Sequence, residues 1–194
     1  MELRQKIDKE ASDHLGRWVG RMPDIWGGAE KTAFPGTYRF KDWGGAAGLE
    51  LTYEAKKQLL GGVFSQVYTL RTEGSALGGQ EETKLHYHGW FLKGDAFFKQ
   101  KGQGAAAELL NRDAELIRLL SALDLLSLSL IFREGSAEIR LSPLGGAFTY
   151  TLFPPVKYGA DLPGTDLERI RRALIRMEIL ISGGEQRSIA GAEA

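Results

Sequence analysis

The stretch "KLHYHGW", residues 84 to 90, is the part of the chain whose residue types could most directly perform chemistry. It holds His86 and His88, and the chain has only one other histidine, His14. Alternate residues of a β-strand point to the same face, so the two imidazoles could converge on a metal ion or a substrate. A catalytic zinc site usually has three protein ligands. The candidates for the third are His14 and three carboxylates: Glu81, Glu82 and Asp95.

The same stretch also fits an ordinary sheet strand. The histidine face would include Trp90 and Leu92, and the opposite face would include Leu85, Tyr87 and Phe91. Both faces are partly apolar, which is typical of a central strand that is covered on two sides. Because two ligands without a fixed third are a weak signal, we predict that the strand holds no catalytic metal and that the protein uses no cofactor. Both histidines, Tyr87 and Trp90 are kept as candidate ligand contacts.

A second candidate site is a row of arginines near the C-terminus. Arg169, Arg172 and Arg176 are spaced i, i+3, i+7, so they line one face of a helix. Such a row could bind a phosphate, an acidic partner or a membrane surface. The acidic Glu168 and Glu178 nearby favour the alternative, which is a solvated helix face.

Two other patterns carry less weight. The glycine-rich stretches "GGAAG" at 44 to 48 and "GQGAAAE" at 102 to 108 do not match the phosphate-loop pattern G-x-x-x-x-G-K-[ST], so nucleotide binding by them is disfavoured. Six aromatic residues crowd into positions 18 to 43 and could anchor a partner. Attachment of the first helix to the sheet is the favoured interpretation. We find no Ser-His-Asp order and no nucleophile elbow.

The composition limits the classes of partner. The 194 residues include 25 basic and 25 acidic side chains, so no global field favours nucleic acid, and we predict no nucleic-acid partner. The absence of cysteine excludes disulfides and thiol nucleophiles. The longest apolar-rich run, "LLSLSLIF" at 125 to 132, is too short to span a membrane. The charged N-terminal stretch lacks the apolar run of a signal peptide, so we predict a cytoplasmic location.

Helical spacing occurs in three places. An amphipathic helix is predicted from the N-terminus to about Pro23, and a second helical stretch covers 104 to 124. In one continuous helix Asp113 would lie among leucines, where an unpaired carboxylate is costly, so we predict a break there with Asp113 as the N-cap of a new helix. The last helix begins at "GTDLERI", where Thr165 and Glu168 match a capping box.

Between the helices the hydrophobic period is two, which predicts strands. "LELTYEAK" at 49 to 56 is the clearest, and we expect "VFSQVYTLRTE" and "TKLHYHGWFLK" to pair as a hairpin. Pro154-Pro155 should end the last strand. These elements predict an α+β fold with an antiparallel sheet of about seven strands, on which N-terminal, broken central and C-terminal helices pack. We predict one domain at 1–182 and a flexible tail at 183–194.

Three functions stay open at this point. The leading hypothesis is a non-catalytic binding module for a protein partner, or a homodimer, because no coherent catalytic set occurs and the sheet and aromatic segment offer surfaces. The alternatives are a metal-dependent enzyme built on His86 and His88, and a carrier of a small apolar ligand held between the sheet and the helices, near Trp90 and Tyr87.

Overall fold

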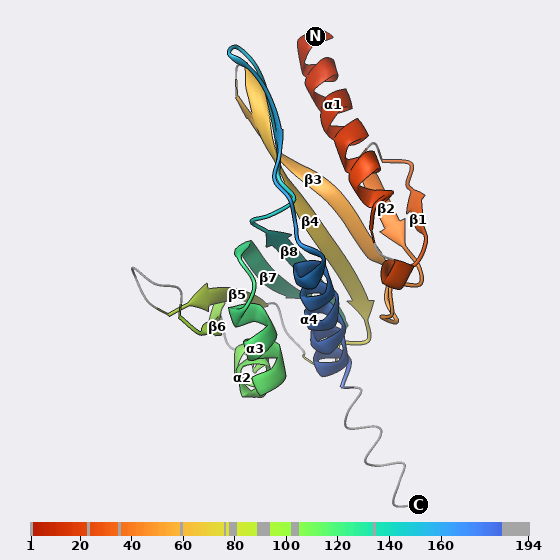
Figure 1. Ribbon diagram of the computed structural model, residues 1–194. Coiled ribbons are helices and arrows are strands. Elements are labelled where there is room, and N and C mark those ends of the chain that lie inside the picture. Colours follow the sequence, from red (N-terminus) through yellow and green to blue (C-terminus); the bar gives the residue numbers. More distant parts are fainter. Residues whose placement is uncertain are drawn as a thin grey trace, which may run out of the picture.

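The computed structural model describes residues 2–22, 24–34, 36–58, 60–75, 77, 81–88, 94–101, 105–133 and 135–183. Its elements follow the order α1 (Glu2–Val19), a 3-10 turn η1 (Asp24–Trp26), β1 (Ala29–Lys31), β2 (Thr37–Phe40), β3 (Leu49–Gln58), β4 (Gly61–Glu73), β5 (Glu81–Tyr87), β6 (Ala96–Lys101), α2 (Ala106–Arg112), α3 (Ala114–Ser121), β7 (Leu125–Arg133), β8 (Ser136–Pro143), β9 (Phe148–Leu152), β10 (Pro155–Gly159) and α4 (Gly164–Ser182). The predicted α+β class is confirmed (Figure 1).

All pairings between the described strands are antiparallel, and the sheet has ten strands rather than about seven. Its order is β1-β2-β3-β4-β8-β7-β5-β6, with β9 paired to the first half of β4 and β10 paired to β9. The strands β1 and β10 were not predicted, because every one of their side chains is exposed and they lack an apolar alternation. The chain does not leave the sheet at Pro154; it turns there, and Pro155 begins β10.

The predicted hairpin between "VFSQVYTLRTE" and "TKLHYHGWFLK" is wrong. Strand β4 pairs with β3, β8 and β9, while β5 pairs with β6 and β7. Hydrophobic alternation defines the two faces of a strand but does not define its neighbours. The edge of β4 that β5 would need is occupied by β8, where Leu70 lies opposite Ile139.

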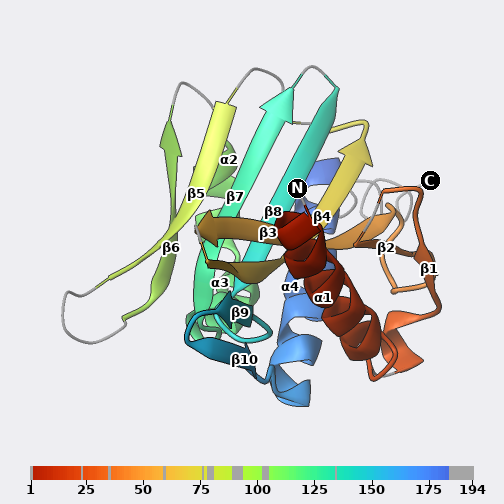
Figure 2. The same ribbon diagram turned by 90° about the horizontal axis from the view of Figure 1, so that it is seen from above.

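One face of the sheet is apolar and carries the helices, and the other is polar. A row of side chains on the covered face crosses five strands as Phe40, Leu49, Leu70, Ile139 and Leu130, all nearly or fully buried. The adjacent row on the outer face reads Arg39, Glu50, Thr69, Arg140, Ser129 and Lys84. The helices α1 and α4 lie on the same side of the sheet, which is its front in Figure 1, and Figure 2 shows the arrangement from above.

Two of the helix predictions can be compared directly with the structure. The break at Asp113 is confirmed, since α3 begins at Ala114 and the Asp113 side chain accepts a hydrogen bond from the Leu116 N–H at 2.8 Å. The capping box is wrong, because α4 begins at Gly164 and has no side-chain cap. The carbonyl of Pro163 accepts the N–H groups of Asp166 and Leu167, so the first turn starts before Thr165. Gly183 ends α4 in the left-handed conformation, and the rest of the predicted tail, 184–194, lies outside the described residues.

The strands extend beyond the helix-covered part of the sheet as an arm, which we define as residues 55–58, 60–64 and 148–159. It comprises the ends of β3 and β4 with all of β9 and β10, and it projects at the top of Figure 1. Among the described helices, α1 backs it: a separate apolar cluster joins Ile7 and Ala11 to Phe64 and Phe148. We call the remaining, helix-covered part the body. None of the helices that the structure describes is both long and apolar enough to cross a bilayer.

Candidate functional site

The two histidines that opened the sequence analysis lie on the outer face of the sheet, near its edge. Both are exposed, and His86 lies opposite Phe97 of β6. The Phe97 ring lies 4.2 Å from the His88 ring and 5.7 Å from the His86 ring, centroid to centroid. The imidazoles therefore both pack on one aromatic ring.

The candidate third ligand, His14, is engaged elsewhere. Its Nδ1 lies 2.8 Å from the hydroxyl of Tyr53, and its ring stacks on Phe148 at 4.3 Å. Among the residues that the structure describes, no group of three or more histidines, aspartates or glutamates is arranged to hold a metal ion. The metal-dependent alternative therefore finds no ligand set in this part of the chain.

Tyr87 lies on the covered face, opposite to the histidines. Its hydroxyl donates to the carbonyls of Leu120 and Leu123 at 3.2 and 3.0 Å, which fastens β5 to the end of α3. Burial raises the pKa of Tyr87 to about 12, so the phenol is neutral near pH 7. Trp90, the other aromatic candidate, lies outside the described residues.

The arginine row on α4 is engaged by acidic side chains of the same chain. Arg169 binds Asp166, Arg172 binds Glu115, and Arg176 binds Asp113 at 2.7 Å. The last two of these ion pairs join α4 to α3. Burial alone would raise the pKa of Asp113, but the Arg176 guanidinium and the Leu116 N–H together hold it below its usual value. We infer that this row mainly holds helices together.

The first glycine-rich loop is held by a carboxylate of its own chain. Glu178 of α4 is 6% exposed, and its two oxygens accept the N–H groups of Ala46 and Ala47 at 3.1 and 2.6 Å. The side chain of Arg171 also donates to the carbonyl of Trp43 at 2.7 Å. The loop amides that could have faced a phosphate therefore face α4. Of the aromatic residues at 18 to 43, three are buried: Trp26, Phe40 and Trp43.

A polar cluster lies where α1 meets the arm. The hydroxyl of Tyr53 donates to the carbonyl of Gly146 at 3.3 Å and lies beside His14. Burial, reinforced by the positive charges of Arg17 and Lys157, lowers the pKa of His14, and burial raises the pKa of Tyr53. Both groups are neutral near pH 7. The cluster joins α1 to β3 and to the loop before β9, and it provides no activated nucleophile.

The outer face of the arm differs from every region described above, because its apolar side chains are uncovered. Two rows cross its strands. The first is Lys56, Val63, Thr149 and Tyr158, and the second is Gly61, Thr151 and Val156. Leu60 and Phe153 occupy the two turns at the tip, where the N–H of Leu152 donates to the carbonyl of Leu60 at 2.8 Å. We call Leu60, Val63, Phe153, Val156 and Tyr158 the arm patch.

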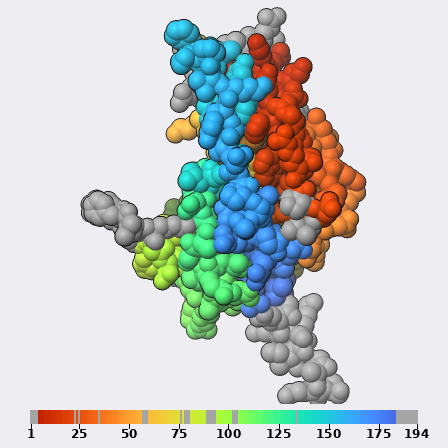
Figure 3. Space-filling view, in the orientation of Figure 1, coloured from red at the N-terminus to blue at the C-terminus, as the bar shows by residue number. Residues whose placement is uncertain are grey.

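The members of the arm patch are strongly exposed. Their exposed fractions are 78% for Phe153, 62% for Tyr158, 45% for Leu60, 41% for Val156 and 37% for Val63. Of the eight large hydrophobic side chains that the described part of the chain exposes, these five lie on the arm. The space-filling view shows the arm standing clear of α4 and the central helices (Figure 3).

The sequence analysis missed the arm patch. Val63 lies in a predicted strand, and alternation alone does not tell which of two faces will be covered. Val156 and Tyr158 follow a Pro-Pro pair that we interpreted as the end of the last strand. The signal that could have found them is an apolar pair at i, i+2 directly after a proline turn, which fits the returning strand of a hairpin.

Comparison with known proteins adds a family but no activity. A family model described as "Protein of unknown function (DUF3156)" matches residues 30–181. No curated protein and no solved structure matches the chain.

Proposed function

The chain belongs to the DUF3156 family, whose function is unknown, and we propose that it is a non-catalytic module that binds a protein partner through the arm patch. The observation that carries this proposal is the gathering of five exposed apolar side chains on two adjacent turns and strands. Single exposed apolar residues are ordinary, whereas large exposed apolar patches mark interaction sites.

The edge of the arm supports the same proposal. Within the described residues β10 pairs only with β9, so its other edge has backbone groups free for an added strand. An extended peptide can add to such an edge, with main-chain hydrogen bonds providing affinity and alternate side chains providing specificity. Pro155 limits indiscriminate pairing, since proline commonly protects sheet edges. Lys157 is directed toward α1, where it binds Glu10 at 2.5 Å.

The arm also indicates the chemistry of the partner. Val156 and Tyr158 stand at alternate positions of β10, so they match an extended segment with apolar side chains at every second residue. The segment that fits best is therefore an extended, apolar stretch of another protein. The two earlier alternatives lack a comparable observation, and the cytoplasmic location stays a prediction.

Photo-crosslinking tests the proposal. A photoreactive phenylalanine analogue is placed at position 153 or 158 of the full chain in the cells that make it, and Phe34 provides a matched control because it is 76% exposed but lies outside the arm. We expect adducts to one defined second polypeptide from 153 and 158, and none from 34. Adducts of twice the chain's mass would show self-association in place of a partner. Equal adducts from position 34, or no adduct from the arm, would contradict the proposal.

A further inference from the structure

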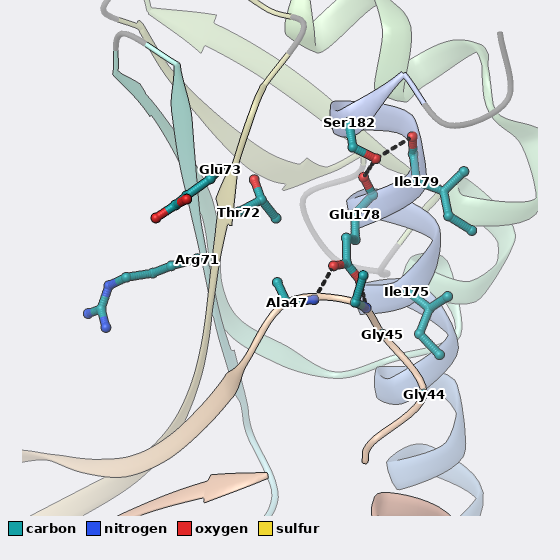
Figure 4. A pocket seen from close by; sticks show the side chains of 11 residues that line it. Gly44, Gly45, Ala47, Arg71, Thr72, Glu73, Ile175, Glu178, Ile179 and Ser182 are labelled. Carbon is teal, nitrogen blue, oxygen red and sulfur yellow. Dashed lines mark hydrogen bonds between the residues drawn. The ribbon is translucent and has the colours of Figure 1, made fainter. Parts of the chain in front are cut away.

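A second surface feature, independent of the arm, lies at the C-terminal end of α4. A cavity of about 510 Å³ opens between the loop at 44–47, the end of β4 and the last turns of α4. This volume falls within the range of small-molecule sites, roughly 300 to 1,000 Å³. Figure 4 shows the strand on one side of the cavity, α4 on the other, and the loop crossing below.

The polar side chains of the described lining are those of Arg71, Thr72, Glu73, Glu178 and Ser182. Glu178 brings a buried carboxylate, which has the two loop N–H donors but no ion pair among the described residues. Thr72 is 5% exposed, and no described residue forms a hydrogen bond with its hydroxyl. A buried hydroxyl without a partner is uncommon and costs free energy. Figure 4 places it between β4 and α4, on the cavity side of the strand.

The electrostatic character of the cavity is negative. The C-terminal end of a long helix carries about half a negative charge, and α4 ends here at Ser182. Ser182 donates its own proton to the carbonyl of Glu178 at 2.8 Å, so its oxygen can still accept. Among the lining residues that the structure describes, Arg71 alone is cationic; its guanidinium binds Glu50 and Glu138 and points away from α4 in Figure 4.

The remaining wall is apolar. Ile175 and Ile179 of α4 line the cavity, and both are partly exposed. Gly45 is required opposite them, because a Cβ at this position would lie 2.1 Å from the Trp43 ring and 2.5 Å from Glu178 Oε2. The cavity thus combines a buried carboxylate, a free hydroxyl and an apolar wall.

We propose that this cavity binds a compact organic ammonium compound. The ammonium group donates to Glu178 and to the hydroxyl of Thr72, and the hydrocarbon body lies against Ile175 and Ile179. A cation is selected because it provides a partner of opposite charge for the buried carboxylate. An anion would be repelled by both Glu178 and the negative end of α4.

The test uses phenethylammonium as the probe, with 2-phenylethanol as its neutral isostere and 3-phenylpropionate as its anionic counterpart. Amide resonances of the isotope-labelled full chain are followed during titration. We expect saturable binding of phenethylammonium, with a dissociation constant on the order of 1 mM, and shifts centred on Ala46, Ala47 and Ser182. The neutral compound should bind at least fivefold more weakly and the anion not at all.

Variants separate binding from folding. Thr72→Val removes the unsatisfied hydroxyl without a change of shape, so it should weaken phenethylammonium binding about fivefold and leave the melting temperature unchanged or higher. Thr69→Val, on the same strand but on the outer face, is the matched control and should bind normally. Glu178→Gln should reduce phenethylammonium binding to the level of the neutral probe. Equal binding of all three probes, or normal binding by Thr72→Val, would overturn the proposal.

Discussion

Strand β4 (Gly61–Glu73) carries two different surfaces on the same face of the sheet. Over the body, Arg71 binds Glu138 at 2.8 Å and Glu50 at 3.0 Å, and Glu50 also binds Arg39 at 2.6 Å. Over the arm, eight residues earlier in the same strand, Val63 stands 37% exposed. A network of ion pairs is stable in contact with water, whereas covering exposed apolar side chains with another surface lowers the free energy. The proposed docking function therefore concerns the arm half of this face and not the body half.

The largest effect should come from the inner side of the arm. Phe148 is 1% exposed and packs with Phe64 and α1, while Phe153 of the same hairpin is 78% exposed. We expect Phe148→Ala to lower the free energy of unfolding by about 3 to 5 kcal/mol and Phe153→Ala to change it by less than about 0.5 kcal/mol. Urea unfolding of both variants checks this pair. A similar cost for both would mean that the exposed phenylalanine has a structural role.

A smaller effect should follow from the body's own charges. Asp113 both caps α3 and binds Arg176, so Asp113→Ala should cost about 2 kcal/mol. The pKa of Asp113 is lower in the folded chain than its usual value near 3.8. The carboxylate therefore stabilises the fold above that usual pKa, and this contribution is lost as the pH falls through the folded pKa.

Unfolding measurements at two pH values check the direction in which the stabilisation by Asp113 changes with pH. The stability difference between wild type and Asp113→Asn should be full at pH 7 and should shrink at pH 3. A difference that is constant between these values would show that the carboxylate charge does not contribute.

The smallest effects concern the outer face itself. Glu50→Gln removes the shared partner of Arg39 and Arg71, and we expect a cost of about 0.5 to 1 kcal/mol that decreases with added salt. Lys56→Gln, on the outer face of the arm, should leave stability unchanged because no described acidic side chain forms an ion pair with Lys56. Thermal unfolding at low and high ionic strength compares the two variants. A loss of stability in Lys56→Gln would show that the Lys56 side chain makes a contact that stabilises the arm.

Much of the fold follows from the sequence because burial has a period. The stripe of α4 and the alternation of β3 indicate which side chains are covered, and the cost of burying Asp113 among leucines predicts the break between α2 and α3. The order of strands does not follow, because alternation is compatible with several neighbours. The displaced start of α4 has a similar cause: Thr165 matched a pattern, but the carbonyl of Pro163 already serves the first turn.

The candidate sites followed less well from the sequence. The sequence analysis selected His86, His88 and the arginine row by residue type alone. In the structure the two histidines pack on the Phe97 ring, and the arginines form ion pairs with acidic side chains of the same chain. The arm patch consists of ordinary apolar residues, whose exposure depends on what the rest of the chain leaves uncovered. Exposure is a tertiary property, so no local pattern in the sequence reports it.

The most direct test of the arm as a docking surface is the affinity for the partner that crosslinks to it, measured with purified proteins. Val156→Asp with Tyr158→Asp places two charges on the arm patch. Ser127→Asp with Ser129→Asp places two charges at the same spacing on the body's outer face, next to Arg140. We predict that the arm variant loses at least about 100-fold in affinity and that the body variant stays within about threefold of wild type. An equal loss in both, or a loss only in the body variant, would contradict the account.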